Sequence, residues 1–154
     1  MKTAEEKRVL GLQKELRLRL YEMGLRIQLM NERNQEQVRE TIDGICELIG
    51  FAKLTKKEEE RNLFPSLAIS APFMVSLLEQ EQDRMLDLGE KICIYIEHWE
   101  NSFTGKQQED SIQQIQLGFN DWMANLLQYL NKQQLLQKGV EEQREKNSIA
   151  VAAA

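Results

Sequence analysis

The chain has 154 residues, of which 42% are hydrophobic and 29% charged, and its net charge is −5. This length predicts a single domain with its own core, and the balanced composition argues against global disorder. The acidic charge disfavours phosphate backbones and anionic membranes, so we expect neither nucleic acid nor membrane as a partner. Because the sequence shows no signal-peptide pattern and no apolar run of transmembrane length, we expect a cytoplasmic protein.

The cysteine content excludes a disulfide-stapled scaffold. Cys46 and Cys93 are the only two cysteines, and they form no CxxC pair. Both fall inside helical patterns. We therefore expect them to be buried and to pack as small hydrophobic residues.

Two amphipathic helices are predicted in the first half of the chain. The first spans about Ala4 to Met30, and its apolar residues recur alternately three and four positions apart, with Gln13 occupying one position of this stripe. The second spans about Glu36 to Leu63. Its apolar face becomes charged in the last turns, beginning at Lys56.

The third helix is predicted from about Pro72 to Trp99. A loop over Ser66 to Ala71 precedes it, because Pro65 and Pro72 bracket this segment and the residue before a proline avoids helical backbone angles. Its predicted buried side consists of Met74, Leu77, Leu78, Met85, Leu88, Ile92 and Tyr95. Gln80 interrupts the edge of that side near its start.

The last helix is predicted from about Asp110 to Lys138, after a loop over Glu100 to Gln108. Gly139 is expected to end it, since glycine is common just after a helix. Tyr129 and Gln133 stand on its apolar stripe.

Four long helices joined by short connections predict an all-α, up-down-up-down four-helix bundle over residues 1–140. Residues 141–154 are charged at first and then small. We expect them to form a polar C-terminal extension with a frayed tail.

The polar interruptions of the four stripes are predicted to meet in one layer. In an antiparallel bundle, the start of the first helix is level with the end of the second, the start of the third and the end of the fourth. Burying a polar group without a partner costs about 1–3 kcal/mol, so this layer is expected to be a hydrogen-bonded network or the lining of a wet pocket. Its predicted members are Gln13, Lys56, Glu60, Gln80, Tyr129 and Gln133.

The segment between the second and third helices carries a resemblance to a known family. It reads Glu58-Glu59-Glu60-Arg61-Asn62-Leu63-Phe64-Pro65-Ser66-Leu67, then Pro72, then Leu78-Glu79-Gln80-Glu81-Gln82-Asp83-Arg84. This resembles the hemerythrin-like (HHE cation-binding) family, whose middle reads HHxxEExxLFPxL and then an E-H step followed by arginine. Weaker matches are Gln13-Lys14-Glu15-Leu16-Arg17, similar to the family's HxxLR, and Leu127-Gln128-Tyr129-Leu130-Asn131-Lys132-Gln133-Gln134, similar to its LQHMxKEE.

The resemblance implies a four-helix bundle in which five histidines and two carboxylates hold two iron ions, but this chain departs from that ligand set. The implied histidine positions carry Gln13, Lys56, Gln80 and Tyr129, and the carboxylate position of the last helix carries Gln133. A register shifted by one residue would place Gln128 and Lys132 there instead, although the stripe favours the first register. Glu60 alone remains as a ligand of the family type, and the single histidine, His98, lies at the far end of its helix.

The altered ligand set predicts that no di-iron centre forms. Iron in such sites prefers imidazole and carboxylate ligands, amides are weak ligands, and the Lys56 ammonium would be repelled by a dication. We therefore expect no metal cofactor and no catalytic residues. One hypothesis is that Lys56 pairs with Glu60 where the metal would be; the other is that the two form a solvated pair on the helix surface.

Three functions remain open at this point. The first is a non-catalytic interaction or regulatory module that binds an unidentified protein partner or self-associates. The second is a small-molecule pocket at the level of the lost metal site. The third is a divergent protein that still binds iron or another divalent cation through Glu60 and neighbouring carboxylates such as Glu59 and Glu79. An enzyme is not expected, because no poised acid–base pair is evident.

Overall fold

The computed structural model describes residues 2–153, which are almost entirely helical and contain no strand. Five helices occupy this range, four of them long. They are α1 (Ala4–Leu29), α2 (Gln35–Asn62), α3 (Phe64–Ser70), α4 (Pro72–Glu100) and α5 (Gly105–Ala153). The predicted all-α class is therefore confirmed.

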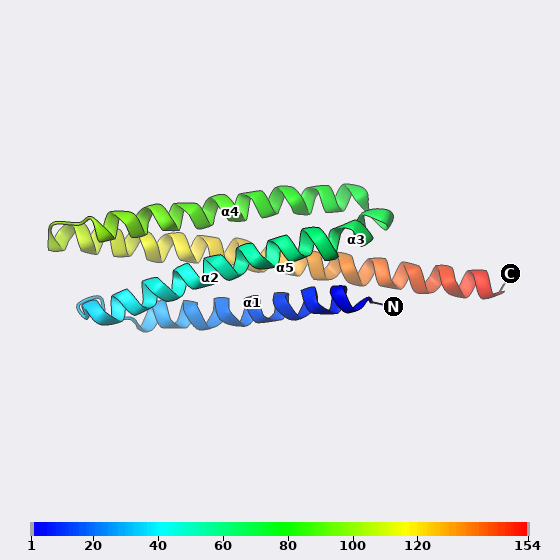
Figure 1. Cartoon of the computed structure of the whole chain (residues 1–154), viewed down its shortest axis with the longest axis horizontal. Coiled ribbons are helices and arrows are strands. Elements are labelled where there is room, and N and C mark those ends of the chain that lie inside the picture. Colours follow the sequence, from blue (N-terminus) through cyan, green and yellow to red (C-terminus); the bar gives the residue numbers. More distant parts are fainter. Residues whose placement is uncertain (1, 154) are drawn as a thin grey trace.

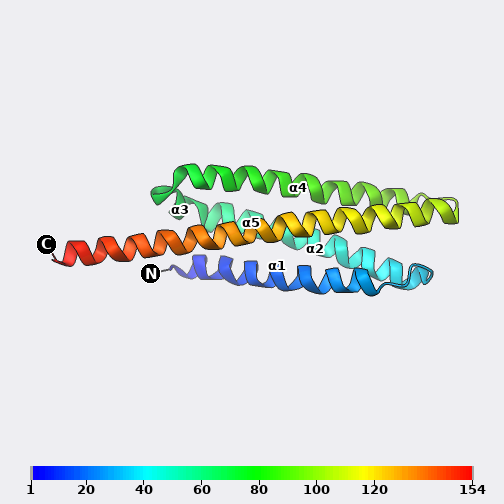
Figure 2. The ribbon, with the colours of Figure 1, turned by 180° about the vertical axis from the view of Figure 1, so that it is seen from behind.

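The four long helices lie side by side, and successive ones run in opposite directions (Figures 1 and 2). α1 pairs with α2 and α4 pairs with α5, while α1 also contacts α5 and α2 also contacts α4. The short α3 reverses the chain between α2 and α4 at the end of the molecule where both termini lie (Figure 1). This arrangement brings the start of α1, the end of α2, the start of α4 and the second half of α5 to one level.

Side-chain caps begin three of the four long helices, while α4 begins with Pro72 and has no side-chain cap. Thr3 and Glu6 form a reciprocal capping box at the start of α1, and the Asn34 side chain accepts a hydrogen bond from the Gln37 N–H at the start of α2. Thr104 accepts from the backbone N–H of Gln107 in the same way. These bonds satisfy N–H groups that a helix leaves free at its N-terminus, which is why α5 begins at Gly105 rather than at the predicted Asp110.

The segment predicted as a loop between the two prolines is mostly helical. α3 takes up Phe64–Ser70, with Pro65 in its first turn, where a missing N–H costs nothing. Phe64 and Leu67 are buried in the core. Burial of these two side chains offsets the cost of forming so short a helix.

The prediction that Gly139 ends the last helix is wrong, because α5 continues to Ala153. Gly139 has no left-handed backbone conformation. Val140, the next residue, is buried, and Arg144 donates hydrogen bonds to the Ser66 backbone carbonyl at 3.0 Å and hydroxyl at 3.2 Å. These contacts hold the helix past the glycine. Beyond Arg144 the described residues are exposed, and the part of the predicted frayed tail up to Ala153 is an exposed helix.

The buried stripe of α4 differs by one position from the predicted one near its start. Val75 and Leu78 are buried, whereas Met74 and Leu77, predicted inside, are exposed. From Val75 the stripe alternates steps of three and four residues, through Gln82 and Met85 to Trp99. Gln82 therefore stands at a core position and Gln80 does not.

Both cysteines are exposed, so the prediction that they are buried is wrong. Cys46 follows the buried Ile45 on α2, and Cys93 follows the buried Ile92 on α4. One residue is a turn of about 100° on a helix, which is enough to move each thiol from the core edge to the surface.

Candidate functional site

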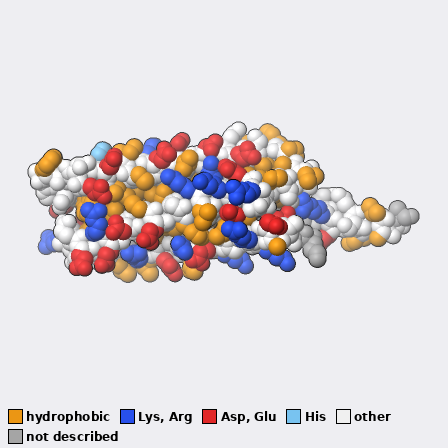
Figure 3. All heavy atoms as spheres, viewed as in Figure 1, with side chains coloured by type: hydrophobic (Ala, Val, Ile, Leu, Met, Phe, Trp, Pro, Cys, Tyr) orange, Lys and Arg blue, Asp and Glu red, His pale blue; other side chains and the backbone are white. Residues whose placement is uncertain are grey.

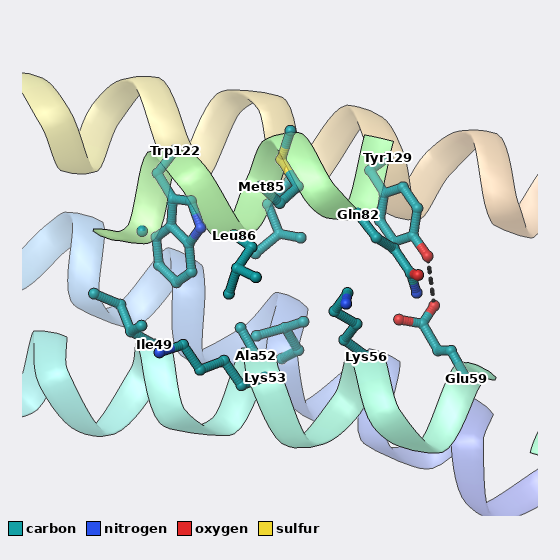
Figure 4. A pocket seen from close by; sticks show the side chains of 13 residues that line it. Ile49, Ala52, Lys53, Lys56, Glu59, Gln82, Met85, Leu86, Trp122 and Tyr129 are labelled. Carbon is teal, nitrogen blue, oxygen red and sulfur yellow. Dashed lines mark hydrogen bonds between the residues drawn. The ribbon is translucent and has the colours of Figure 1, made fainter. Parts of the chain in front are cut away.

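A buried carboxylate occupies the level at which the polar positions of the four long helices meet. Glu59, in the last turn of α2, is only 2% exposed. Its Oε2 accepts hydrogen bonds from Gln13 Nε2 of α1 and from the Tyr129 hydroxyl of α5, each at 2.9 Å. Figure 4 shows the Tyr129 bond across the interior. Three helices are thus joined through one oxygen atom.

Two further buried amides complete this layer. Gln82 of α4 is 3% exposed and Gln133 of α5 is fully buried. Within the described residues, neither amide group of these two completes a hydrogen bond, although both lie close enough to Glu59 to lower its pKa. The Gln82 amide points toward the Glu59 carboxylate and the Tyr129 hydroxyl in Figure 4. We call Gln13, Glu59, Gln82, Tyr129 and Gln133 the polar layer.

Burial controls the protonation of the polar layer. Desolvation raises the pKa of Glu59 from 4.5 to about 7, and the polar side chains around it, chiefly Gln133, Tyr129 and Gln13, limit this rise. Desolvation, followed by the nearby charge of Glu59, raises the pKa of Tyr129 above its ordinary range. Tyr129 is therefore a permanent hydrogen-bond donor, while Glu59 changes charge near neutral pH.

Within the described part of the chain, the Glu59 carboxylate has no positively charged partner. Among residues 2–153, no lysine or arginine nitrogen forms an ion pair with Glu59. Lys56 turns instead toward the surface, where its ammonium lies 3.1 Å from Glu60 and 3.8 Å from Asp83. A buried charge without a counter-ion is costly, which is why burial raises the pKa of Glu59.

A small cavity adjoins the polar layer between α2 and the α4–α5 pair (Figure 4). Its volume is about 40 Å³, with Glu59 and Tyr129 at one end. Apolar side chains form most of its wall, among them Ile49, Met85 and Trp122. The space has room for about three water molecules and is far below the several hundred Å³ typical of organic-ligand pockets.

Some of the site residues predicted from the sequence lie in the polar layer, and others lie outside it. Gln13, Tyr129 and Gln133 belong to the polar layer, and Gln128 and Lys132 of the alternative register are exposed. Lys56 is partly exposed at the rim. The hypothesis of an internal Lys56–Glu60 pair is wrong, since both side chains form the solvated surface pair that was its alternative.

Two predicted members of the layer are wrong: Glu59 and Gln82 occupy it in place of Glu60 and Gln80. Glu60 and Gln80 are exposed, whereas Glu59 and Gln82 are buried. The three-and-four spacing of each buried stripe selects Glu59 and Gln82, whereas the family motif aligned with Glu60 and Gln80. Helical periodicity was therefore the signal that could have found both.

The donor set of the polar layer is a carboxylate, a phenol and three amides. Within residues 2–153, no group of three or more histidine, cysteine, aspartate or glutamate side chains is placed to hold a metal ion. His98 is exposed near the far end of α4. These residues do not fit a di-iron centre, which takes most of its ligands from imidazoles and carboxylates.

Comparison with protein-family models, with curated proteins and with solved structures gives no match for this chain. None of the helices in the described part of the chain is both long and apolar enough to cross a membrane.

Proposed function

We propose that this protein is a non-catalytic, up-down-up-down four-helix bundle of the hemerythrin-like kind in which a polar layer replaces the di-iron site. It acts as an interaction or regulatory module, in the cytoplasm. The observation that carries this proposal is the buried Glu59 carboxylate, which Gln13 and Tyr129 hold from two other helices. In the family that the chain resembles, residues at this level bind iron.

The geometry of the layer supports a structural rather than a catalytic role. Glu59 is 2% exposed, and the cavity that adjoins it measures about 40 Å³. General acid–base catalysis requires a substrate within hydrogen-bond reach of the titrating group. A substrate larger than a few atoms could not reach this carboxylate without the helices moving apart.

Metal analysis of the purified protein tests the loss of iron. We expect substoichiometric iron after expression in iron-supplemented medium, and no ligand-to-metal charge-transfer band in the visible spectrum. The Glu59→Gln variant is the matched control, because it removes the one carboxylate of the layer. Stoichiometric iron in the wild type that disappears in this variant would overturn the proposal.

Apolar surface supports the interaction role. Leu18, Tyr21, Leu25 and Leu29 of α1 are 54%, 55%, 57% and 71% exposed and recur on one face. A second group, Ile69, Phe73, Met74 and Leu77, covers α3 and the start of α4. Figure 3 shows apolar side chains over both regions. Exposed apolar patches of this kind mark surfaces that bind proteins.

Light scattering across a range of concentrations tests whether the α1 face binds a second copy. We expect a mass above that of the monomer, and a return to the monomer in Leu25→Glu. Gln28→Glu, also exposed on α1, is the control for added charge. If the wild type is monomeric at all concentrations, the α1 face does not bind a second copy. The partner would then be a different protein, which crosslinking at Leu25 would capture.

One observation favours the alternative that the layer still binds a cation. Among the described residues, the amides of Gln82 and Gln133 near Glu59 have no hydrogen-bond partner. Carboxylate and amide oxygens are ligands of hard cations. Titration with Ca²⁺ and Mg²⁺, followed by tryptophan fluorescence, tests it. Saturable changes that Glu59→Gln abolishes would establish this alternative in place of the metal-free layer.

A further inference from the structure

A second recess lies between α1 and α5, and Gln13 is one of its lining residues. Its volume is about 360 Å³, within the range of pockets that bind small organic ligands. Leu10 and the buried Leu130 contribute apolar surface to it, and Gln13, Gln134 and Gln137 contribute amides. The two helices that form it run side by side in Figure 2. We call it the α1–α5 groove.

Cross-helix bonds close the α1–α5 groove at both ends. At one end Arg17 donates a hydrogen bond of 2.9 Å to Asn131 Oδ1. At the other end Lys2 and Glu141 form an ion pair of 3.1 Å. Asn131 and Glu141 are ten residues apart on α5, so the groove is about 15 Å long.

The α1–α5 groove is positively charged in a protein whose net charge is −5. Its charged lining consists of Lys2, Lys14, Arg17, Lys138 and Glu141. Lys2 is paired with Glu141, but Lys14 and Lys138 form no ion pair within residues 2–153, and Arg17 bonds only a neutral amide. Three positive charges therefore stay uncompensated along one recess.

An unpartnered buried donor also borders the α1–α5 groove. Gln137 is 7% exposed, and its amide nitrogen has no acceptor among the described residues. A buried N–H group without an acceptor costs about 1–3 kcal/mol. This nitrogen is closed off from solvent, so the basic side chains of the groove, and not this amide, would recognise a ligand.

We propose that the α1–α5 groove binds a small organic anion with more than one phosphate or carboxylate group. Lys14 and Arg17 hold one acidic group from α1, Lys138 holds another from α5, and Leu10 and Leu130 contact the body of the ligand. This site is independent of the metal-site replacement, because none of its charged groups belongs to the polar layer.

Calorimetric titration with pyrophosphate and with citrate tests the proposal. The compound that binds more tightly shows whether the groove prefers phosphate or carboxylate groups. We expect a dissociation constant below about 1 mM for at least one of them, weakening with added salt. The Lys14→Gln/Lys138→Gln double variant should bind at least about ten-fold more weakly. Lys53→Gln/Lys91→Gln, which removes two exposed lysines elsewhere, should bind as the wild type does.

Two results would overturn the proposal. One is the absence of binding to either compound at millimolar concentration. The other is equal affinity in the two double variants, which would indicate attraction to surface charge in general. Glu59→Gln should keep the affinity, so the result for this groove does not depend on the role of the polar layer.

Discussion

The hydroxyl of Tyr129 donates a hydrogen bond of 2.9 Å to the carboxylate of Glu59, and both side chains are 2% exposed. This bond joins α5 to α2 inside the core, where a carboxylate without donors would be prohibitively costly. Gln13 adds a second bond to the same oxygen atom. The other carboxylate oxygen remains available to carry a proton.

The protonation of Glu59 predicts a stability that falls as pH rises. Its pKa is about 7 in the folded protein against 4.5 ordinarily, so the folded state binds the proton more tightly than the unfolded state does. The free energy of unfolding should therefore lose about 3 kcal/mol between about pH 4.5 and pH 7 through this group and change little through it above that range. Urea unfolding at a series of pH values measures this loss.

Glu59→Gln isolates that contribution. A glutamine can keep an oxygen acceptor for Gln13 and Tyr129 but carries no charge. The variant should be more stable than the wild type at pH 8, and its stability should depend less on pH between 4.5 and 7. Glu60→Gln is the matched control, because Glu60 is exposed. Equal pH profiles for wild type and Glu59→Gln would contradict a raised pKa.

Tyr129→Phe should destabilise the protein by about 1–3 kcal/mol, because it removes a donor from a buried acceptor. The loss should be larger at pH 8 than at pH 5, since the ionised carboxylate forms the stronger hydrogen bond. Tyr21→Phe, at a tyrosine that is 55% exposed, should have no comparable effect. Equal losses in the two variants would show that the buried bond contributes nothing.

The helices and the level of the polar layer could be predicted from sequence because both follow from periodicity. Three-and-four spacing placed Gln13, Tyr129 and Gln133 correctly. Choosing between Glu59 and Glu60 required the rotation of α2 to be known within about 100°. The family motif aligned with Glu60, whereas the stripe through Ala52 and Leu63 passes through Glu59.

The helix ends were harder to predict because tertiary contacts decide them. Gly139 is a common residue at a helix end, but its own preference is worth only about 1 kcal/mol. Burial of Val140 and the contacts of Arg144 with Ser66 outweigh that preference. Both depend on α3, which the sequence did not predict as a helix.

Lys56→Met should change stability by less than about 1 kcal/mol, because the partners of Lys56 are exposed carboxylates. The Glu60 and Asp83 side chains that it contacts are 45% and 77% exposed. Thermal unfolding at low and high salt measures the effect, and Lys57→Met at an exposed position is the control. A loss above about 2 kcal/mol in Lys56→Met alone would place this lysine in the buried network after all.

Shortening α5 should show which part of its C-terminal end contributes to the free energy of unfolding. A chain that ends after Arg144 loses only exposed residues among those described, so its free energy of unfolding should stay within about 0.5 kcal/mol of the wild type. A chain that ends after Lys138 also loses the buried Val140 and both bonds from Arg144 to Ser66. It should be less stable by about 2–4 kcal/mol.

A point variant distinguishes the effect of the Arg144 contacts from the effect of the length of α5. Arg144→Met keeps the full helix and removes the two hydrogen bonds to Ser66, so it should reproduce part of the loss seen in the chain that ends after Lys138. Arg61→Met, at an exposed arginine near the same end of the molecule, controls for the change of charge. The chain that ends after Lys138 could instead unfold at the same urea concentration as the wild type. In that case residues 139–144 do not stabilise the fold, and the part of α5 that does so ends before Gly139.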